Sequence, residues 1–384
     1  MYTLGSSSRR ATPIMPAVRY QLGSFPPKHL DWARLVPKLG PTAAAVARYD
    51  GMLAAVPNPA VLLSPLTTQE AVLSSKIEGT QATMGEVLEF EAGEEAKSSE
   101  HREDIREIQN YRSAMRKAGQ LLGKLPLSGR VLLDAHRVLL NSVRGQNKGP
   151  GNYRRVTNWI GRQGSTIATA RFVPPPPDRV GELMAAWERY AHAQPEDRLV
   201  QIAVLHAEFE AIHPFADGNG RLGRMIVPLY LWQTKQISKP MFYVSGYLEA
   251  HRDAYYDRLL GVSRDGDWTG WCEFFLDALR AQAEENLKKT RAILALHASM
   301  SEQLADLTRS QHASRALAWM FAKPVFRSSD FVKSAKIPTP TAHRFLAVLR
   351  EAAVLKTVKP ARGTQAAVFA FPALVNIVEG RKVF

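Results

Sequence analysis

The spacing of apolar residues predicts helices along most of the chain. Ile105, Ile108, Met115 and Leu122 recur at spacings of three and seven residues, so one face of that segment is apolar. This is the pattern of an amphipathic helix. Similar patterns predict helices over residues 132–143, 178–192, 195–212, 249–260 and 268–296, and from about residue 220 onward. We therefore expect a mainly α protein.

The N-terminal part has a weaker pattern. Residues 1–60 predict an extended strap followed by a short helix that ends before Asp50-Gly51. The following stretch LTTQEAVLSSKIEGT predicts a helix capped by Thr67 or Thr68 and ended by Gly79. Threonine side chains accept hydrogen bonds from the free amides at a helix start, and glycine is common just beyond a helix end.

The helical pattern is interrupted at residues 150–177. The stretch NYRRVTNWIGRQGSTIATARFVPPPP mixes turn residues with β-branched residues and closes on four prolines. Such a composition predicts a β-hairpin that leaves through a polyproline II segment. We expect a small hairpin inserted in an otherwise helical core.

Residues 301–384 predict a winged-helix-like C-terminal domain. Three short helical patterns precede LKTVKPARGTQAAVFAFP, which predicts a hairpin with a basic tip, and this order is that of a winged helix. The segment carries 13 Lys and Arg against five Asp and Glu, in a chain of net charge +14. Thr341, His343 and Arg344 would then face the DNA major groove; a protein contact on the same fold is the alternative.

Composition narrows the class of protein. Apolar residues make up 45% and charged residues 22% of the 384 residues, which is typical of globular proteins. No apolar run reaches the roughly 18–20 residues of a membrane span, and the N-terminus lacks the apolar stretch of a signal peptide. We expect a cytoplasmic protein. The single cysteine, Cys272, allows neither an internal disulfide nor a cysteine-based zinc site.

The segment HPFADGNGRLGR, residues 213–224, concentrates residues that carry chemistry. A helix rich in Leu, Val and Phe precedes His213, and Pro214 then prevents the helix from continuing. The glycines and asparagine that follow allow successive backbone amides to turn toward one anion at the start of the next helix, an arrangement that suits a polyphosphate.

The same segment supplies charged groups for a phosphate. Arg221 and Arg224 are three residues apart and would share a helix face, so both guanidinium groups could bind phosphate oxygens. Asp217 could hold a hard divalent cation such as Mg²⁺, and His213 could accept a proton from an attacking hydroxyl. These residues together predict a phosphate-transfer site.

A zinc site is the competing hypothesis. His206, Glu210 and His213 follow spacings of four and three residues and could face one metal ion, since histidine and carboxylate groups are zinc ligands. Pro214 argues against it, because the chain turns away at His213.

Residues 213–224 resemble the Fic family signature HxFx(D/E)GNGRxxR at every specified position. The resemblance implies a Fic-type helical core that moves AMP from ATP, with Mg²⁺, to a hydroxyl side chain of a target protein. It implies that His213 is the general base and Asp217 the Mg²⁺ ligand. The nucleotide-binding residues that we predict are Gly218, Asn219, Gly220, Arg221, Gly223, Arg224 and, in a downstream segment that resembles the family's, His251.

Two further segments resemble parts of the same family. Ser74, Glu78 and Gly79 match the inhibitory motif (S/T)xxxE(G/N) that one class of Fic proteins carries before the core. If Glu78 pairs with Arg224, it occupies the group that would bind the γ-phosphate. The hairpin PGNYRRVTNWIG…ARFVPPPP resembles the flap that holds a target segment by strand pairing.

These observations predict four parts and one function. The parts are a strap and short helix (1–60), an inhibitory helical region (61–110), a Fic core (111–300) with its flap at about 150–177, and the winged-helix-like domain (301–384). We expect an autoinhibited protein adenylyltransferase with a protein target, possible self-modification and a homodimeric state. The alternatives are a phosphotransferase on the same fold and a DNA-binding regulator with a nucleotide-sensing core.

Overall fold

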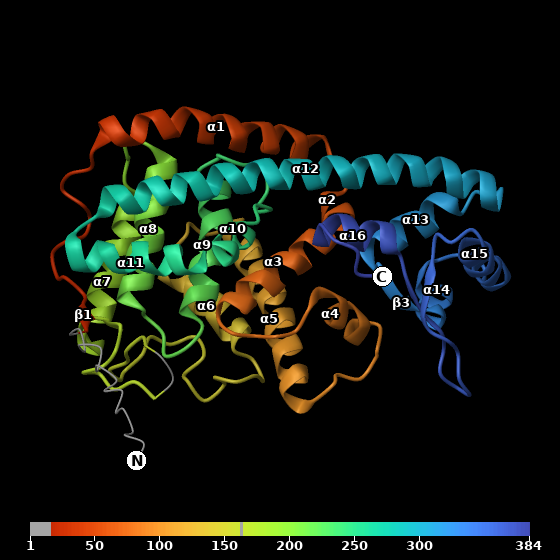
Figure 1. Cartoon of the computed structure of the whole chain (residues 1–384), viewed down its shortest axis with the longest axis horizontal. Coiled ribbons are helices and arrows are strands. Elements are labelled where there is room, and N and C mark those ends of the chain that lie inside the picture. Colours follow the sequence, from red (N-terminus) through yellow and green to blue (C-terminus); the bar gives the residue numbers. More distant parts are fainter. Residues whose placement is uncertain (1–16, 162–163) are drawn as a thin grey trace, which may run out of the picture.

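The computed structural model describes residues 17–161 and 164–384, and most of them are helical. The 41-residue helix α12 (Trp268–Thr308) runs along the molecule beside α1 (Trp32–Ala55), and its far end leads into the C-terminal helices and strands (Figure 1). None of the helices in this part of the chain combines the length and apolar character that a membrane crossing requires. The predicted mainly α fold is confirmed.

Besides α1 and α12, the described residues form one group of α-helices before residue 240 and a second group after it. The first group is α2 (Pro59–Leu62), α3 (Ser64–Ile77), α4 (Met84–Glu91), α5 (Ser99–Leu122), α6 (Gly129–Leu139), α7 (Val180–His192), α8 (Arg198–Ile212) and α9 (Asn219–Gln233). The second group is α10 (Ser245–Ala250), α11 (Arg252–Asp265), α13 (Ala313–Ala322), α14 (Ser328–Ser334), α15 (Thr339–Glu351) and α16 (Pro372–Glu379).

Helices α8 and α9 form the centre of the molecule. Both are buried on almost every side, because α5, α7 and α12 pack around them. Two buried indoles from the surrounding helices donate to backbone carbonyls of α8: Trp187 to Leu205 at 2.8 Å and Trp271 to Ala203 at 2.7 Å. The segment between α8 and α9, residues 213–218, is therefore supported by the most buried part of the core.

The prediction of a short helix that ends before Asp50-Gly51 is wrong, because α1 continues to Ala55. Tertiary contacts outweigh the local turn signal here. Tyr49 and Leu53 lie four residues apart on the buried face of α1, on either side of Gly51. The carboxylate of Asp50 accepts from the amide of Ser238 at 2.6 Å, so this polar residue serves a long-range contact.

The predicted hairpin contains very little regular strand. Strand β2 (Phe172–Val173) is bridged to Ile160 on one side and pairs in parallel with β1 (Val18–Arg19) on the other. The strap that precedes α1 thus contributes a strand that covers one edge of β2. The hydroxyl of Tyr20 donates to Glu208 of α8 at 2.6 Å and fixes the strap to the core.

In the C-terminal region, residues 301–384, the helices and strands follow the predicted order of three helices and a hairpin. Strands β3 (Val325–Arg327), β4 (Lys356–Lys359) and β5 (Val368–Ala370) form one antiparallel sheet in the order β3-β5-β4, next to α13, α14 and α15. Arg344, predicted to face DNA, donates to the carbonyl of Thr308 at the end of α12. Helices α2, α5 and α12 run through the predicted boundaries near residues 60, 110 and 300.

Candidate active site

His213 lies where α8 ends. Its backbone is left-handed, with a φ of 48°, and its amide still donates to the carbonyl of Phe209 at 3.0 Å. Pro214 follows, and because proline has no amide hydrogen the helix cannot continue. A residue other than glycine pays about 1–3 kcal/mol for such a conformation, so the surrounding structure must hold His213 in place.

The turn from α8 to α9 is braced from within. Gly218 has a φ of 79° and precedes α9, whose first amides have no helical acceptor. The amide group of Asn219 bonds both backbone groups of Phe215, accepting from its N–H at 2.9 Å and donating to its carbonyl at 2.8 Å. Asn219, predicted to bind nucleotide, therefore uses its side chain to shape the loop.

His136 of α6 supports the same loop, although no motif in the sequence indicated this role. Its ring stacks on Phe215 with the centroids 3.8 Å apart. Nδ1 accepts from the amide of Gly151 at 2.9 Å, so Nε2 carries the proton and donates to the carbonyl of Asp217 at 2.9 Å. Burial lowers the pKa of His136 to about 4, which keeps the ring neutral near pH 7.

Arg154 joins the stem of the flap to the end of α8. Its guanidinium donates to four carbonyls, those of His213 at 2.8 Å, Ile212 at 3.3 Å, Pro175 at 2.5 Å and Val156 at 3.2 Å. Arg154 is buried, with 4% of its surface exposed, and backbone carbonyls serve as the counter-groups of its charge. Arg154 thus fixes the flap relative to His213.

A cavity of about 1090 Å³ opens beside His213. Its walls come from α8, α9, α11 and the flap residues between Ile160 and Phe172. His213, Gly220, Arg224 and Glu78 line one part of it. The remaining lining includes the aromatic and apolar residues Tyr255, Tyr256, Leu259 and Leu260.

Arg224 is fully buried and is held from α3. Its Nε donates to the hydroxyl of Ser74 at 2.9 Å, and its Nη2 donates to the carbonyl of Ser74 at 2.8 Å and to Glu78 Oε1 at 2.6 Å. Ser74 and Glu78 are four residues apart and so lie on one side of α3 and its end. The predicted pair of Glu78 with Arg224 is present in the structure.

Glu78 is ionised in this arrangement. Burial opposes its charge, but the Arg224 guanidinium outweighs that effect and lowers the pKa of Glu78 below its ordinary value. The contact also depends on Gly220: a Cβ at that position would lie 2.1 Å from Glu78 Oε1 and 3.0 Å from Arg224 Nη1. Nη1 itself is buried without a hydrogen-bond partner among the described residues.

Arg221 and Asp217 lie outside that ion pair. Arg221 is buried, and its Nη1 donates to Glu107 of α5 at 2.9 Å while Nη2 lies 3.3 Å from Asp217 Oδ1. The Asp217 side chain is 39% exposed. Its carboxylate is therefore the hard-oxygen group of the loop that a divalent cation could reach from solvent.

His213 can serve as a proton acceptor. Burial lowers its pKa to about 4, so the imidazole is neutral near pH 7. Its Nδ1 is buried and has no hydrogen-bond partner within residues 17–161 and 164–384. The ring lines the cavity.

The zinc hypothesis fails on the contacts of His206. Its Nδ1 lies 3.1 Å from the carbonyl of Gly223 and must donate, so Nε2 accepts from the hydroxyl of Tyr255 at 2.8 Å. Both ring nitrogens are thus used. Over the part of the chain that the structure describes, no group of three His, Cys, Asp or Glu residues could hold a metal ion.

Glu210 is a cavity residue without an assigned role. It lines the cavity, and its Oε1 is buried with no hydrogen-bond partner in the described chain. Burial raises its pKa to about 8, although Arg224 acts in the other direction. A Cβ at Gly223 would lie 2.3 Å from that oxygen, so this glycine leaves room for the carboxyl group.

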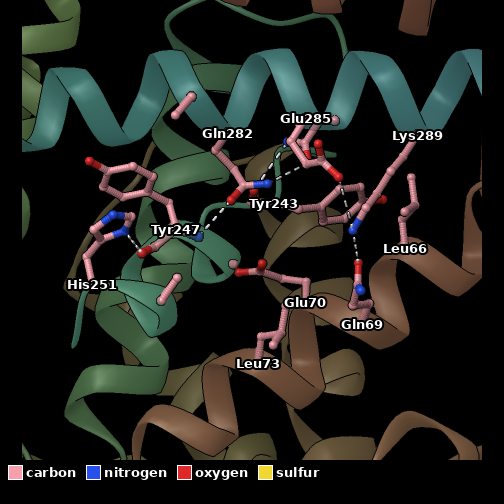
Figure 2. Close-up of a pocket in the computed structure, with 14 residues that line it drawn as sticks. Leu66, Gln69, Glu70, Leu73, Tyr243, Tyr247, His251, Gln282, Glu285 and Lys289 are labelled. Atoms are coloured by element: carbon pink, nitrogen blue, oxygen red, sulfur yellow. Dashed lines mark hydrogen bonds and ion pairs between the residues drawn. The ribbon is translucent and has the colours of Figure 1, made fainter. Parts of the chain in front are cut away.

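His251 lies apart from the other predicted residues. It lines a second cavity of about 300 Å³ between α3, α10 and α12, where its ring stacks on Tyr247 and its Nδ1 donates to the carbonyl of Tyr247 at 2.9 Å (Figure 2). Of the predicted nucleotide-binding set, Gly220 and Arg224 line the larger cavity with His213 and Glu78. Its lining does not include Gly218, Asn219, Arg221, Gly223 or His251.

Comparison with known families agrees with this geometry. The family model described as Fic/DOC family N-terminal matches residues 36–120, and the model described as Fic/DOC family matches residues 126–231. The chain belongs to the Fic/DOC family.

Curated relatives are similar over part of their length. A protein adenylyltransferase Fic of Culex quinquefasciatus is 28% identical over 149 residues, which are 38% of this chain and 26% of the relative. One of Drosophila virilis is 24% identical over 250 residues, 63% of this chain and 46% of the relative. The chain thus spans about a quarter to a half of these relatives.

Solved structures support the fold over more of the chain. A Fic family protein from Desulfovibrio desulfuricans G20 has a TM-score of 0.60 at 22% identity, covering 90% of this chain and 98% of that one. A Fic domain containing signaling protein from Bacteroides thetaiotaomicron VPI-5482 has a TM-score of 0.53 at 17% identity, with coverages of 66% and 97%. At these identities the likeness concerns the fold.

The protonated state of Glu210 leads to a prediction about stability. Burial raises the pKa of the Glu210 carboxyl group from its ordinary value of 4.5 to about 8 in the folded chain. Between pH 4.5 and pH 8 the folded state therefore binds more protons than the unfolded state. Stability therefore falls as pH rises through this range. The side chain introduced by Glu210→Gln stays neutral at both pH values. We therefore expect the free energy of unfolding of the variant minus that of the parent to be larger at pH 8 than at pH 5. Denaturant unfolding at both values measures this, and a constant difference would contradict it.

Proposed function

We propose that this chain is a protein adenylyltransferase that transfers AMP from ATP to a hydroxyl side chain of a target protein. The observation that carries the proposal is that a neutral histidine and a buried guanidinium, His213 and Arg224, line one cavity. A proton acceptor beside a phosphate-binding cation suits phosphoryl-group chemistry. The names of the curated relatives support AMP as the transferred group.

In the proposed reaction a hydroxyl oxygen of the target attacks the α-phosphorus of ATP. The new oxygen–phosphorus bond forms as the bond to the β-phosphate breaks, and pyrophosphate leaves. The imidazole of His213 accepts the hydroxyl proton. The main contribution of the protein is then to position the reacting groups and to offer fixed donors to the phosphates.

The phosphates would bind at the start of α9, where Gly220 and Arg224 line the cavity. Backbone amides at this helix start have no helical acceptor and suit an anion. Arg224 would bind the γ-phosphate once Glu78 leaves it. Asp217 fits a Mg²⁺ ion, because its exposed carboxylate is a hard ligand and the nucleotide would supply further oxygens. Bound Mg²⁺ would neutralise phosphate charge.

Glu78 would inhibit the enzyme by occupying Arg224. The carboxylate lies 2.6 Å from Nη2 of Arg224 and leaves no room for a side chain at Gly220. ATP that enters beside this pair lacks its γ-phosphate contact, so its α-phosphorus is misaligned for attack. A charge-assisted hydrogen bond is worth about 1.5–3 kcal/mol, which corresponds to a suppression of roughly ten- to a hundredfold.

The flap would receive the target. Three large apolar side chains on it are exposed, with 63% for Val156, 44% for Trp159 and 38% for Ile167. Apolar side chains exposed on one segment are available to contact a bound peptide. An extended target segment that packs on them would bring a hydroxyl to the cavity that the flap lines.

Labelled ATP separates this function from the alternative of phosphate transfer. The full chain is incubated with a cell lysate, Mg²⁺ and ATP labelled at the α- or the γ-phosphate. Adenylyl transfer labels protein from the α position only. Label from the γ position only would identify a phosphotransferase, which must bind the nucleotide in the opposite direction.

The inhibitory ion pair predicts the effect of removing Glu78. Glu78→Gly frees Arg224, so we expect AMP transfer, including self-modification, to rise at least about tenfold, with a smaller change in ATP affinity. Transfer rates from α-labelled ATP measure this. An unchanged rate in a variant with a normal circular dichroism spectrum would assign Glu78 a merely structural contact.

His213 is expected to affect the rate more than binding. In the Glu78→Gly background, His213→Ala removes the proton acceptor but leaves Arg224 and the amides of α9. We therefore expect a rate lower by about 10²–10⁴-fold, with an ATP dissociation constant within a few-fold of the parent value by calorimetry. A rate within a few-fold of the background would remove His213 from the mechanism.

Asp217 is expected to determine the Mg²⁺ dependence. Asp217→Ala removes the exposed carboxylate of the loop, and the magnesium-dependent gain in ATP affinity should disappear along with transfer. Calorimetric titration of ATP with Mg²⁺ and with EDTA measures that gain. The prediction is wrong if the variant binds ATP more tightly with Mg²⁺ to the same extent as the parent.

A further inference from the structure

The helix that carries Ser74 and Glu78 is attached to the C-terminal region. Gln69 of α3 donates through Nε2 to the carbonyl of Val378 in α16 at 2.6 Å. Its Oε1 accepts from the ammonium group of Lys289 in α12 at 2.8 Å (Figure 2). This one side-chain amide therefore connects α3 to both α16 and α12. Helix α13 also packs against α3.

Helix α4, on the other side of Glu78, is attached to the same region. It packs on β3, whose Arg327 donates to the carbonyl of Gly93 just after α4. Lys359 of β4 forms an ion pair with Glu94. At the start of α4, a Cβ on Gly85 would meet Val383 at 3.6 Å, so the C-terminal residues lie over this helix.

Glu78 thus stands between two helices that both contact the C-terminal region, in addition to the packing of α3 on α5 and α10 and of α4 on α5. The six residues 78–83 join α3 to α4, and such a short link lets its residues move little unless one of the two helices moves. The opposite partner, Arg224, belongs to α9 in the middle of the core. The position of Glu78 relative to Arg224 therefore depends on how firmly α3 and α4 are held.

We infer that the C-terminal region holds Glu78 in its inhibitory position, and that its contacts with α3 and α4 set the degree of inhibition. This inference rests on the proposed function, in which Glu78 inhibits AMP transfer. The polar contacts involved are few: one side-chain amide, one hydrogen bond to a carbonyl and one ion pair, beside the packing of α13 and α16 on α3 and of β3 on α4. A partner of the C-terminal region that altered any of them would thus raise activity without entering the active site.

The test uses the full-length chain with Gln69→Ala. Gln120→Ala, which changes an exposed glutamine on α5, is the matched control. Hydrogen exchange of residues 64–78 without nucleotide and AMP transfer from α-labelled ATP are both measured. We expect faster exchange over 64–78 and transfer raised about three- to tenfold by Gln69→Ala, as the loss of a hydrogen bond implies. Neither should change in Gln120→Ala.

The same pair of measurements in the Glu78→Gly background makes the inference falsifiable. With Glu78 absent there is nothing to release, so Gln69→Ala should add no further gain in transfer. An equal gain in both backgrounds, or unchanged exchange over residues 64–78, would overturn the inference. If Glu78→Gly itself gives no gain, the proposed inhibition fails, while the exchange measurement still decides whether α3 is held.

A second variant covers the case in which Gln69→Ala does not fold. The double variant Arg327→Ala with Lys359→Ala cuts the contacts to the segment after α4, and Lys356→Ala on the same strand is its control, since Lys356 is exposed. The double variant should raise exchange over residues 84–94 and raise transfer, and the control should do neither. Equal behaviour of the two would overturn the inference.

Discussion

The buried guanidinium of Arg224 is the constraint on which the site depends. A buried cation needs counter-groups, and here α3 supplies three acceptors from Ser74 and Glu78. These contacts fix the side of α3 that faces α9. The guanidinium that holds α3 against the core is therefore the same group that the proposed nucleotide would have to bind.

The loop around His213 is organised by side chains that satisfy backbone groups. Arg154 binds the carbonyl of His213, His136 binds that of Asp217, and Asn219 binds both backbone groups of Phe215. These three side chains lie at different distances along the chain from the backbone groups that they bind. Such bonds hold a left-handed histidine in one conformation, which a reacting imidazole requires, since small displacements of reacting groups lower rates sharply.

The sequence allowed the local parts of this arrangement to be predicted and left the long-range parts open. Ser74 and Glu78 follow helical spacing, and residues 213–224 form one continuous motif, so neighbouring positions carried enough information. Contacts between distant segments do not leave such a pattern, which is why His136 and Arg154 gave no signal. The same reason explains α1, whose passage through Gly51 depends on buried neighbours. It also explains His251, which lines the cavity beside α10 and α12 rather than the cavity beside His213.

Gly220 links the chemistry of the site to its control. Because a Cβ there would overlap Glu78 Oε1, the observed contact of Glu78 with Arg224 requires a residue without a side chain at position 220, unless the carboxylate moves. A larger residue at position 220 would therefore displace the carboxylate that now lies beside Arg224. The two positions are thus coupled sterically, although they lie far apart in the sequence.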